Sequence, residues 1–326
     1  MESATVRQAP AAENQPLDQP GVAPRPHQGH TPLERPRLCL MADLLDDLRE
    51  DAAAAHVAKM DGVARGPVTG FKKLDADLGG CLPVGLNIVH GQPGAGKSAF
   101  ALQVAAKCGF PALYVTCEMA PLELLRRQSA RVTGTYLNRF KTGEMSPDEC
   151  VALARRGAAA SPYLGLVDAT RAGADLGYLR ECVDVIRARA AHDGCHARQV
   201  LLVIDSLHSW AEGVALSVPG GDSSEYEVLN AALAGLRTLS HSVSCPVLAI
   251  AERNRDSMKS GGLSAGAGTR KLEYSAETVF DLTRSEEARD SSSVEVVVKL
   301  VKNRNGAAGK ATPLLFQGAK QLFEER

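Results

Sequence analysis

The chain has 326 residues, of which 44% are hydrophobic and 23% are charged. This composition is typical of a globular protein, it excludes a wholly disordered, collagenous or disulfide-knitted chain, and the length suffices for about two domains or one large one. With 37 basic and 38 acidic residues the net charge is -1, so binding to nucleic acid would need a local basic surface.

The cysteine pattern predicts a reducing compartment. The chain has eight cysteines and no C-x-x-C pair, and several cysteines lie in apolar stretches, as is typical of buried thiols in cytoplasmic proteins. No run approaches about 18 uncharged apolar residues, and the first residues lack the plan of a signal peptide. The sequence therefore predicts a cytoplasmic protein that does not span a membrane.

Residues 1–37 are rich in proline. Seven of the 17 prolines lie there, together with glutamine, alanine and scattered charges. Such a composition cannot bury enough apolar surface to offset the entropy of the chain. We therefore expect residues 1–37 to form a disordered tail.

Residues 38–60 are predicted to contain an amphipathic helix. From Leu40 onward, apolar residues recur at three- and four-residue steps with charged residues between them. These apolar residues are Met41, Leu44, Leu45, Leu48, Ala52 and Ala55. The stripe either packs on the chain's own domain or is buried on a neighbouring subunit.

Residues 61–326 are predicted to form one α/β domain. Short apolar runs alternate with longer helical patterns, which indicates a central, mostly parallel sheet flanked by helices. Strands are expected at Leu86 to His90, Ala112 to Cys117, Tyr163 to Val167, Val200 to Ile204, Pro246 to Ala251 and Val294 to Val301. Helices are expected at about Ser98 to Lys107, Pro121 to Thr133, Ser146 to Ala159, Asp175 to His192 and Glu225 to Ser242.

A phosphate-binding loop follows the first of these strands. Residues 91–98 read GQPGAGKS, a full match to the Walker A pattern G-x-x-x-x-G-K-[ST] between a strand and a helix. The glycines let backbone N–H groups point at phosphate oxygens, Lys97 would meet the β- and γ-phosphates, and Ser98 would offer its hydroxyl to Mg²⁺. The residues expected to hold ATP here are Gly91, Gly94, Ala95, Gly96, Lys97, Ser98 and Ala99.

Glu118 is the candidate general base. It follows the apolar strand Ala112 to Cys117, and a glutamate in this place can orient and deprotonate the water that attacks the γ-phosphate. The alternative is a solvated glutamate at the start of a loop.

Asp205 is the second candidate ligand of Mg²⁺, beside Ser98. It ends the apolar run Val200 to Ile204, which would place it at the carboxyl end of a buried strand, next to the phosphates. An aspartate in this position is also a common helix or turn cap, and the phosphate-binding loop favours the metal.

Two connections are long, polar and rich in glycine and serine, at Glu212 to Ser224 and at Asp256 to Thr269. Loops of this length inside a compact domain are uncommon and tend to be functional or mobile.

Taken in order, these residues resemble the carboxy-terminal ATPase domain of DnaB-type replicative helicases, superfamily 4. The resemblance covers roughly residues 40 to 326, and the glutamate-methionine pair and the Lys-x-Arg-Asn-Gly run near the end are its more specific parts. The residues that carry it are Thr69-Gly70-Phe71, Leu74-Asp75, Gly79-Gly80, the phosphate-binding loop, Cys117-Glu118-Met119, Arg139 to Gly143, Val203-Ile204-Asp205, and Lys302 to Gly306 with Gly309.

The resemblance implies a RecA-like domain that assembles into a ring, usually a hexamer, with Mg-ATP between subunits and single-stranded DNA in the centre. Arg304 looks like an arginine finger and Lys302 like its companion, both reaching the neighbour's γ-phosphate. Without the resemblance, the favoured interpretation of Lys302 and Arg304 is two exposed strand-end charges. The segment 38–60 matches the linker helix that docks on an adjacent protomer. The second polar connection matches a DNA-facing loop, and its candidate phosphate contacts are Arg253, Arg255, Lys259, Arg270 and Lys271.

The chain departs from the family pattern in two places. Such helicases usually carry an amino-terminal domain that contacts primase, whereas residues 1–37 are too polar to replace it, so no primase or loader interaction is expected. Where the family has a glutamine that senses the γ-phosphate, this chain has Glu252. A carboxylate near a triphosphate is repelled unless it is protonated or paired.

The sequence thus favours an ATP-dependent DNA helicase or translocase that acts in DNA replication. The alternative is a RecA-like regulatory or recombination ATPase that binds its partners without unwinding DNA.

Overall fold

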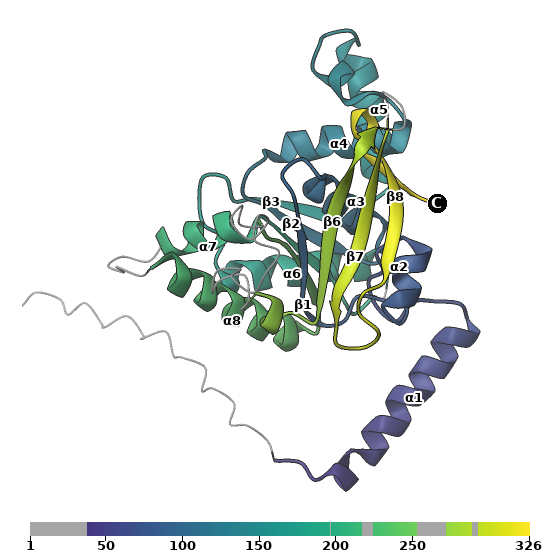
Figure 1. Ribbon diagram of the computed structural model, residues 1–326, viewed down its shortest axis with the longest axis vertical. Helices are drawn as coiled ribbons and strands as arrows, with labels where there is room; N and C mark the ends of the chain where they lie inside the picture. The colour runs from purple at the N-terminus through teal and green to yellow at the C-terminus, as the bar shows by residue number, and fades with distance from the viewer. Residues whose placement is uncertain (1–37, 196, 217–223, 253–271, 289–292) are drawn as a thin grey trace, which may run out of the picture. The chain divides into compact units, whose positions relative to one another are not determined.

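The computed structural model describes residues 38–195, 197–216, 224–252, 272–288 and 293–326 (Figure 1). The predicted tail, residues 1–37, lies outside them. Two units are distinguished, Met1–Ala52 and Ala53–Arg326. The first part of the described chain forms a 3₁₀ turn, η1 (Met41–Leu44), followed by helix α1 (Leu45–Met60). Both elements are fully described, and none of their residues is buried.

The second unit is built on one sheet. Within the described residues it has nine strands in the order β3-β2-β4-β5-β1-β6-β7-β8-β9. The strands from β3 to β6 in this order pair in parallel, and β6, β7, β8 and β9 pair antiparallel. The strands are β1 (Gly85–Gly91), β2 (Ala112–Thr116), β3 (Leu164–Asp168), β4 (Leu201–Asp205), β5 (Pro246–Ile250), β6 (Thr278–Ala288), β7 (Val294–Asn303), β8 (Ala311–Gln317) and β9 (Leu322–Glu325).

Helices cover both faces of this sheet (Figure 1). They are α2 (Lys72–Asp77), α3 (Lys97–Lys107), α4 (Pro121–Thr133), α5 (Pro147–Ala159), α6 (Leu176–His192), α7 (Leu207–Leu216) and α8 (Glu225–Val243). Helices α2, α3 and α4 share one core with the sheet, and α6, α7 and α8 share the other. None of the helices in the described ranges is long and apolar enough to cross a bilayer.

The alternating direction of side chains along the central strands explains why the sheet has two cores. In β4, Leu201 and Val203 belong to one core, whereas Leu202 and Ile204 belong to the other. Successive side chains of a strand point to opposite faces of the sheet, so a central strand covered on both faces is apolar at most of its positions. This is why the strands read as short unbroken apolar runs.

The last strand braces the phosphate-binding helix α3. The side chain of Gln103 in α3 donates to the carbonyl oxygen of Phe323 at 2.7 Å and accepts from the N–H of Phe323 at 2.9 Å. The carboxylate of Glu325 accepts from the backbone N–H groups of Lys72 and Lys73 at 2.7 and 2.6 Å. Strand β9 therefore ties the start of α2 and the body of α3 to the edge of the sheet.

The α/β class, the mostly parallel sheet and each expected strand and helix of the domain are present. Strands β6, β8 and β9 and helices α2 and α7 were not predicted. Strand β6 carries Asp281 and Arg284, β8 contains Pro313, and β9 is only four residues long, so none of them reads as an apolar run. The expected polar loop from Glu212 was wrong at its start, because α7 continues to Leu216; residues 217–223 lie outside the described chain.

The parallel strands place the phosphate-binding loop and three predicted site residues at one edge of the sheet. Strands β1, β2, β4 and β5 run in the same direction, and the phosphate-binding loop follows β1. Glu118 lies just after β2, Asp205 ends β4 and Glu252 lies just after β5. Ligands of open parallel sheets bind at this carboxyl edge.

Candidate active site

The phosphate-binding loop has the backbone conformation that its glycines allow. Gly94 has φ 78° and Gly96 has φ 88°, and Gly96 is the N-cap of α3. A Cβ atom at Gly96 would lie 3.0 Å from Cζ of Phe323 and 3.2 Å from Cε1 of Phe316. Glycine is therefore required at position 96 both for its backbone angle and for its contact with the two rings, which stack at 4.2 Å between centroids.

Lys97 lies at the start of α3 and faces the loop. Its Nζ donates to the carbonyl oxygens of Gly91 at 3.0 Å and Gln92 at 3.3 Å. Burial lowers the pKa of Lys97, and the carboxylates of Glu252, Asp205 and Glu118 oppose that change. The amine is thus surrounded by three acidic groups at the place where a nucleotide's phosphates would enter.

Ser98 and Asp205 form the candidate metal site. The Ser98 hydroxyl donates to Oδ1 of Asp205 at 3.3 Å, and the Tyr114 hydroxyl donates to Oδ2 of Asp205 at 2.6 Å. Burial raises the pKa of Asp205, while the hydrogen bonds from Tyr114 and Ser98 lower it. A carboxylate beside a hydroxyl, both at the mouth of a glycine-rich cradle, is the oxygen donor set that Mg²⁺ takes beside a nucleotide's phosphates, so these residues fit the ion.

Glu118 is held by a tight turn and one hydroxyl. The Thr116 hydroxyl donates to the carbonyl oxygen of Met119 at 2.5 Å and accepts from the Met119 N–H at 3.2 Å, which closes the turn around Glu118. The Ser209 hydroxyl in α7 donates to Oε1 of Glu118 at 3.3 Å. Burial and the nearby carboxylates of Asp205 and Glu118 raise the pKa of Cys117 to about 12.

These residues line one cavity of about 360 Å³, a volume typical of small-molecule sites. Lys97, Ser98, Glu118, Asp205 and Glu252 are all part of its wall. Of the other loop residues expected to hold ATP, Gly94, Gly96 and Ala99 line it, whereas Gly91 and Ala95 do not.

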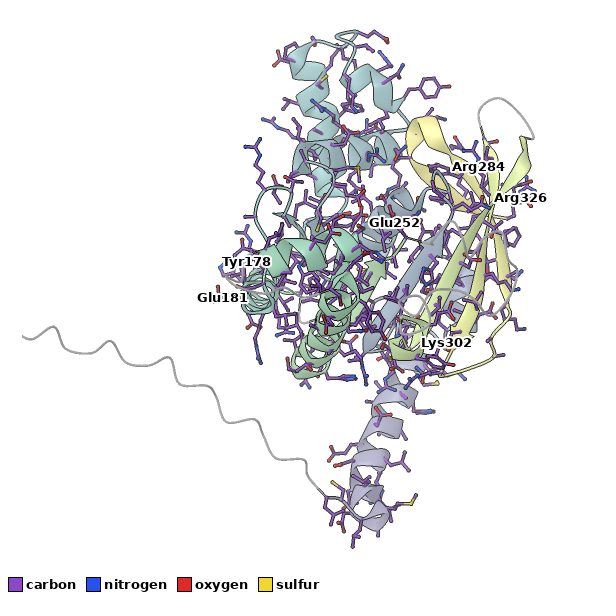
Figure 2. The ribbon with its side chains drawn as sticks, turned by 60° about the vertical axis from the view of Figure 1, so that its left-hand side comes forward. Tyr178, Glu181, Glu252, Arg284, Lys302 and Arg326 are labelled. Carbon is purple, nitrogen blue, oxygen red and sulfur yellow. The ribbon has the colours of Figure 1, made fainter. Side chains whose placement is uncertain are left out.

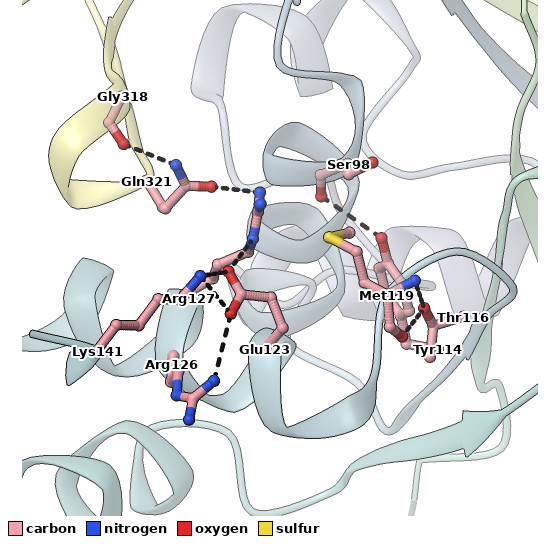
Figure 3. A network of polar contacts seen from close by, with 10 residues as sticks. All are labelled: Ser98, Tyr114, Thr116, Met119, Glu123, Arg126, Arg127, Lys141, Gly318 and Gln321. Carbon is pink, nitrogen blue, oxygen red and sulfur yellow. Dashed lines mark hydrogen bonds and ion pairs between the residues drawn. The ribbon is translucent and has the colours of Figure 1, made fainter. Parts of the chain in front are cut away.

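Five lining residues outside the phosphate-binding loop were not predicted as site residues: Arg127, Ser206, Ile250, Phe316 and Gln321. Figure 3 shows Arg127 between two partners: Nη1 donates to Oε1 of Gln321 at 2.8 Å, and Nε donates to Oε1 of Glu123 at 3.3 Å. The i,i+4 spacing of Glu123 and Arg127 was the only sequence signal for the contact between these two residues. Phe316 and Gln321 come from the β8–β9 hairpin, far away in the sequence.

Glu123 is the centre of a cationic cluster beside the cavity (Figure 3). Its carboxylate lies 2.8 Å from Nζ of Lys141, 3.3 Å from Nε of Arg127 and 3.7 Å from Nη1 of Arg126. Hydrogen bonds and charges from Lys141 and Arg127 lower the pKa of Glu123 against the opposing effect of burial. One carboxylate is thus shared by three cations, of which Arg127 lines the cavity.

Lys302 and Arg304 lie away from this cavity. Figure 2 shows Lys302 far from Glu252. Lys302 pairs with Val279 near the start of β6, and the N–H of Arg304 donates to the carbonyl oxygen of Glu277, just before that strand. Their side chains donate to the carbonyl oxygens of residues just before β6: Nζ of Lys302 to Glu273 at 2.6 Å, and Nη2 of Arg304 to Tyr274 at 2.9 Å.

The pairing of the strands gives the distance between Arg304 and the phosphate-binding loop. Gly91, which opens the phosphate-binding loop, pairs with Leu282 of β6, whereas Arg304 is level with Glu277. Five residues of strand span about 16 Å, and β7 is two strands away from β1. Lys302 and Arg304 are therefore not brought together with Lys97 within one chain. The candidate DNA contacts Arg253, Arg255, Lys259, Arg270 and Lys271 lie outside the described residues.

Comparison with known proteins agrees with this architecture. The family model described as DnaB-like helicase C terminal domain matches residues 66–325. One similar solved structure is described as an ATPase domain, with a TM-score of 0.69 and 19% identity over 86% of this chain and 98% of that one. Another is a DnaB-like replicative helicase described with its interactions with primase, with a TM-score of 0.67 and 19% identity over 88% of this chain and 67% of that one. The fold is thus that of RecA-like ATPase domains, and the chain belongs to the family of DnaB-like helicase C-terminal domains.

Proposed function

We propose that this protein is an ATP-dependent DNA helicase or translocase that hydrolyses Mg-ATP between subunits while it moves on single-stranded DNA in replication. The observation that carries the proposal is the division of the candidate machinery. Lys97, Ser98, Asp205 and Glu118 surround one cavity, and Arg304 lies near the other end of the same sheet. A single chain supplies only part of the site.

The phosphate-binding loop, Asp205 and Glu118 have separate roles in this proposal. The loop N–H groups and Lys97 bind the β- and γ-phosphates of ATP, and Mg²⁺, when bound to Ser98 and Asp205, neutralises charge on these phosphates. Glu118 accepts the proton of the attacking water, because it lies in the cavity wall. Phosphoryl transfer depends mainly on positioning and charge.

In this proposal, Arg304 of the neighbouring subunit supplies a positive charge to the γ-phosphate. Arg304 is half-exposed, and its ion pair with Glu277 is long, at 3.8 Å, so it can exchange its cis contacts for a phosphate of the next subunit. The fixed charge of an arginine finger speeds phosphoryl transfer by about 10³ to 10⁵. Lys302 assists from the same segment, and its pKa is lowered by burial and by Arg304.

The remaining parts of the proposal concern assembly and DNA. Helix α1 exposes Leu45 and Leu48, each 62% accessible, and serves as the linker helix that docks on the adjacent protomer of a hexameric ring. Arg253, Arg255, Lys259, Arg270 and Lys271 contact the phosphates of the single strand. The eight cysteines are free thiols, which supports a cytoplasmic location.

A mixing experiment tests the composite site. Lys97→Ala and Arg304→Ala should each lower DNA-stimulated ATPase activity by about 100-fold or more, while circular dichroism and thermal unfolding show that the fold is retained. In an equimolar mixture, about one interface in four joins an intact Lys97 to an intact Arg304, so part of the activity should return. A mixture as inactive as its components, or full activity of Arg304→Ala alone, would contradict a site shared between subunits.

The second candidate function is a regulatory or recombination ATPase that does not unwind DNA. The specific observation in its favour is Glu252, an exposed carboxylate in the cavity wall that interacts with Lys97. Its negative charge opposes a γ-phosphate and would weaken the link between hydrolysis and movement. Strand displacement on a forked duplex separates the two: the helicase releases the labelled strand with ATP, whereas the regulatory ATPase hydrolyses ATP and releases none.

A further inference from the structure

The carboxylate of Glu118 is in contact with a short chain of serine hydroxyls. Oγ of Ser209 lies 3.3 Å from Oε1 of Glu118, and Oγ of Ser206 lies 3.0 Å from Oγ of Ser209. Among the described residues, Ser209 gives the hydrogen bond to the Glu118 side chain. Ser206 also lines the nucleotide cavity, so the chain of hydroxyls begins at the cavity wall.

The direction of these hydrogen bonds follows from the chemistry of the groups. An ionised carboxylate only accepts hydrogen bonds, and a serine hydroxyl has a single hydrogen to donate. Because the hydrogen of Ser209 is used on Glu118, the hydrogen between the two serines must come from Ser206. The two O–H dipoles then point the same way, from Ser206 through Ser209 to Glu118, and each strengthens the other.

Ser209 is held in place by a rigid support. It lies in the first turn of α7, where the N–H of Trp210 donates to the carbonyl oxygen of Ser206 at 3.0 Å. The Trp210 side chain is buried, and its Nε1 donates to the carbonyl oxygen of Ala174 at 2.7 Å. Glu118, by contrast, is exposed and lies within a turn. A hydroxyl anchored on a helix therefore restrains a carboxylate that would otherwise sample several rotamers.

We propose that Ser209, supported by Ser206, is a positioning residue for Glu118 and keeps its carboxylate aimed at the attacking water. This inference rests on the proposed function, in which Glu118 is the general base. Ser209 makes no contact with ATP and acts only through Glu118. Ser209 is absent from the wall of the nucleotide cavity, which predicts an effect on turnover and none on nucleotide binding. A hydroxyl that only stabilised the fold would instead lower the thermal midpoint and leave kcat per folded molecule unchanged.

The test compares steady-state ATPase kinetics of Ser209→Ala with those of the unmodified full chain. We expect kcat to fall about three- to tenfold, as for loss of one ordinary intramolecular hydrogen bond, with KM and the Kd of a fluorescent ATP analogue unchanged within about twofold. Ser209→Thr keeps the hydroxyl and should retain most of the kcat. Ser242→Ala is the matched control and should leave kcat unchanged; it removes a helix serine whose hydroxyl, within the described parts of the chain, donates to the carbonyl oxygen of Leu239 at 2.9 Å.

The possible failures can be told apart. Alanine favours helix more than serine does, so Ser209→Ala should fold, and its thermal midpoint checks this. Unchanged kcat in Ser209→Ala, together with strong loss in Glu118→Gln, would overturn the positioning role alone. Loss of kcat in Ser209→Thr equal to that in Ser209→Ala would also overturn it. Full ATPase activity in Glu118→Gln would instead contradict the general base of the proposed function.

Discussion

Ser98 and Asp205 are 107 positions apart in the chain, and the Ser98 hydroxyl donates to the Asp205 carboxylate at 3.3 Å. Strand β4 brings Asp205 to the end of the sheet where α3 begins. The Tyr114 hydroxyl holds the second carboxylate oxygen at 2.6 Å, which leaves the acid fixed beside the phosphate-binding loop.

Replacing Asp205 by asparagine should separate metal from nucleotide binding. The amide keeps the shape of the side chain but loses the charge that attracts Mg²⁺, so ATPase activity should fall by about 100-fold or more. Binding of a fluorescent ADP analogue without Mg²⁺ should change little, because the loop and Lys97 are intact. Equal Mg²⁺ dependence of activity in the variant and the unmodified protein would rule out Asp205 as a ligand.

The affinity for Mg²⁺ should fall at acid pH in a way that reflects the burial of Asp205. Burial raises the pKa of this carboxyl above its usual 3.8, so on acidification the group takes up a proton before an exposed aspartate does. Mg²⁺ needs the ionised form, and its affinity should therefore begin to fall at pH values above 3.8. Titration of Mg²⁺ at a series of pH values, at fixed ionic strength, measures this, and Asp205→Asn should lack that part of the dependence.

Glu252→Gln should favour ATP over ADP. The substitution removes a negative charge from the cavity wall where the γ-phosphate is expected, and a charge pair of this kind is worth about 1 kcal/mol, or about fivefold in affinity. The Kd of ATP should fall by this factor at low salt, with less change for ADP and a smaller effect at high salt. Glu181→Gln makes the same change in net charge on α6 and is the control (Figure 2); an equal response of both variants would contradict a local role.

Gly96→Ala and Gly94→Ala should differ. Both glycines have positive φ, at 88° and 78°, and alanine there costs about 1–2 kcal/mol of unfolding free energy. Only Gly96 also faces rings at 3.0 and 3.2 Å, which should add about 1–3 kcal/mol. Urea unfolding of both variants measures the difference, and equal stabilities would show that the Phe316–Phe323 pair yields without cost.

The Cys117 thiol should resist alkylation. Burial and the carboxylates of Asp205 and Glu118 raise its pKa to about 12, so only about 10⁻⁴ of it is thiolate at pH 8. Removing one of these negative charges in Glu118→Gln stabilises the thiolate, lowers the pKa and should speed the reaction with iodoacetamide. Mass spectrometry of the Cys117 peptide follows the rate, with the half-buried Cys150 as an internal reference; an unchanged rate would place Glu118 away from the thiol.

The sequence predicted the parts of the site that come from strands followed by loops. The phosphate-binding loop, Glu118 and Asp205 each follow an apolar run, and parallel strands bring their ends together whatever the loops between them do. The β8–β9 hairpin was not predicted, because Pro313 and the shortness of β9 hide it. Phe316 and Gln321 reach the cavity only through this long-range pairing, and nothing in their local sequence indicates it.

Arg127, Ser206 and Ser209 were missed for a different reason. They lie on helices or turns next to predicted residues, but which face of α4 or α7 points to the cavity depends on packing. For α7 that packing is set by Trp210, whose Nε1 donates to the carbonyl oxygen of Ala174 at 2.7 Å. A side-chain contact with a backbone oxygen on another segment leaves no periodic pattern to read.

The brace between Gln103 and Phe323 links the phosphate-binding loop to the antiparallel edge of the sheet. Helix α3, which begins at that loop, has its Gln103 side chain bonded to the backbone of Phe323 in β9, and a Cβ atom at Gly96 would meet the Phe323 ring at 3.0 Å. Docking of β9 should therefore help to order the loop. A truncation after β8 should weaken nucleotide binding, although it would remove none of Lys97, Ser98 and Asp205.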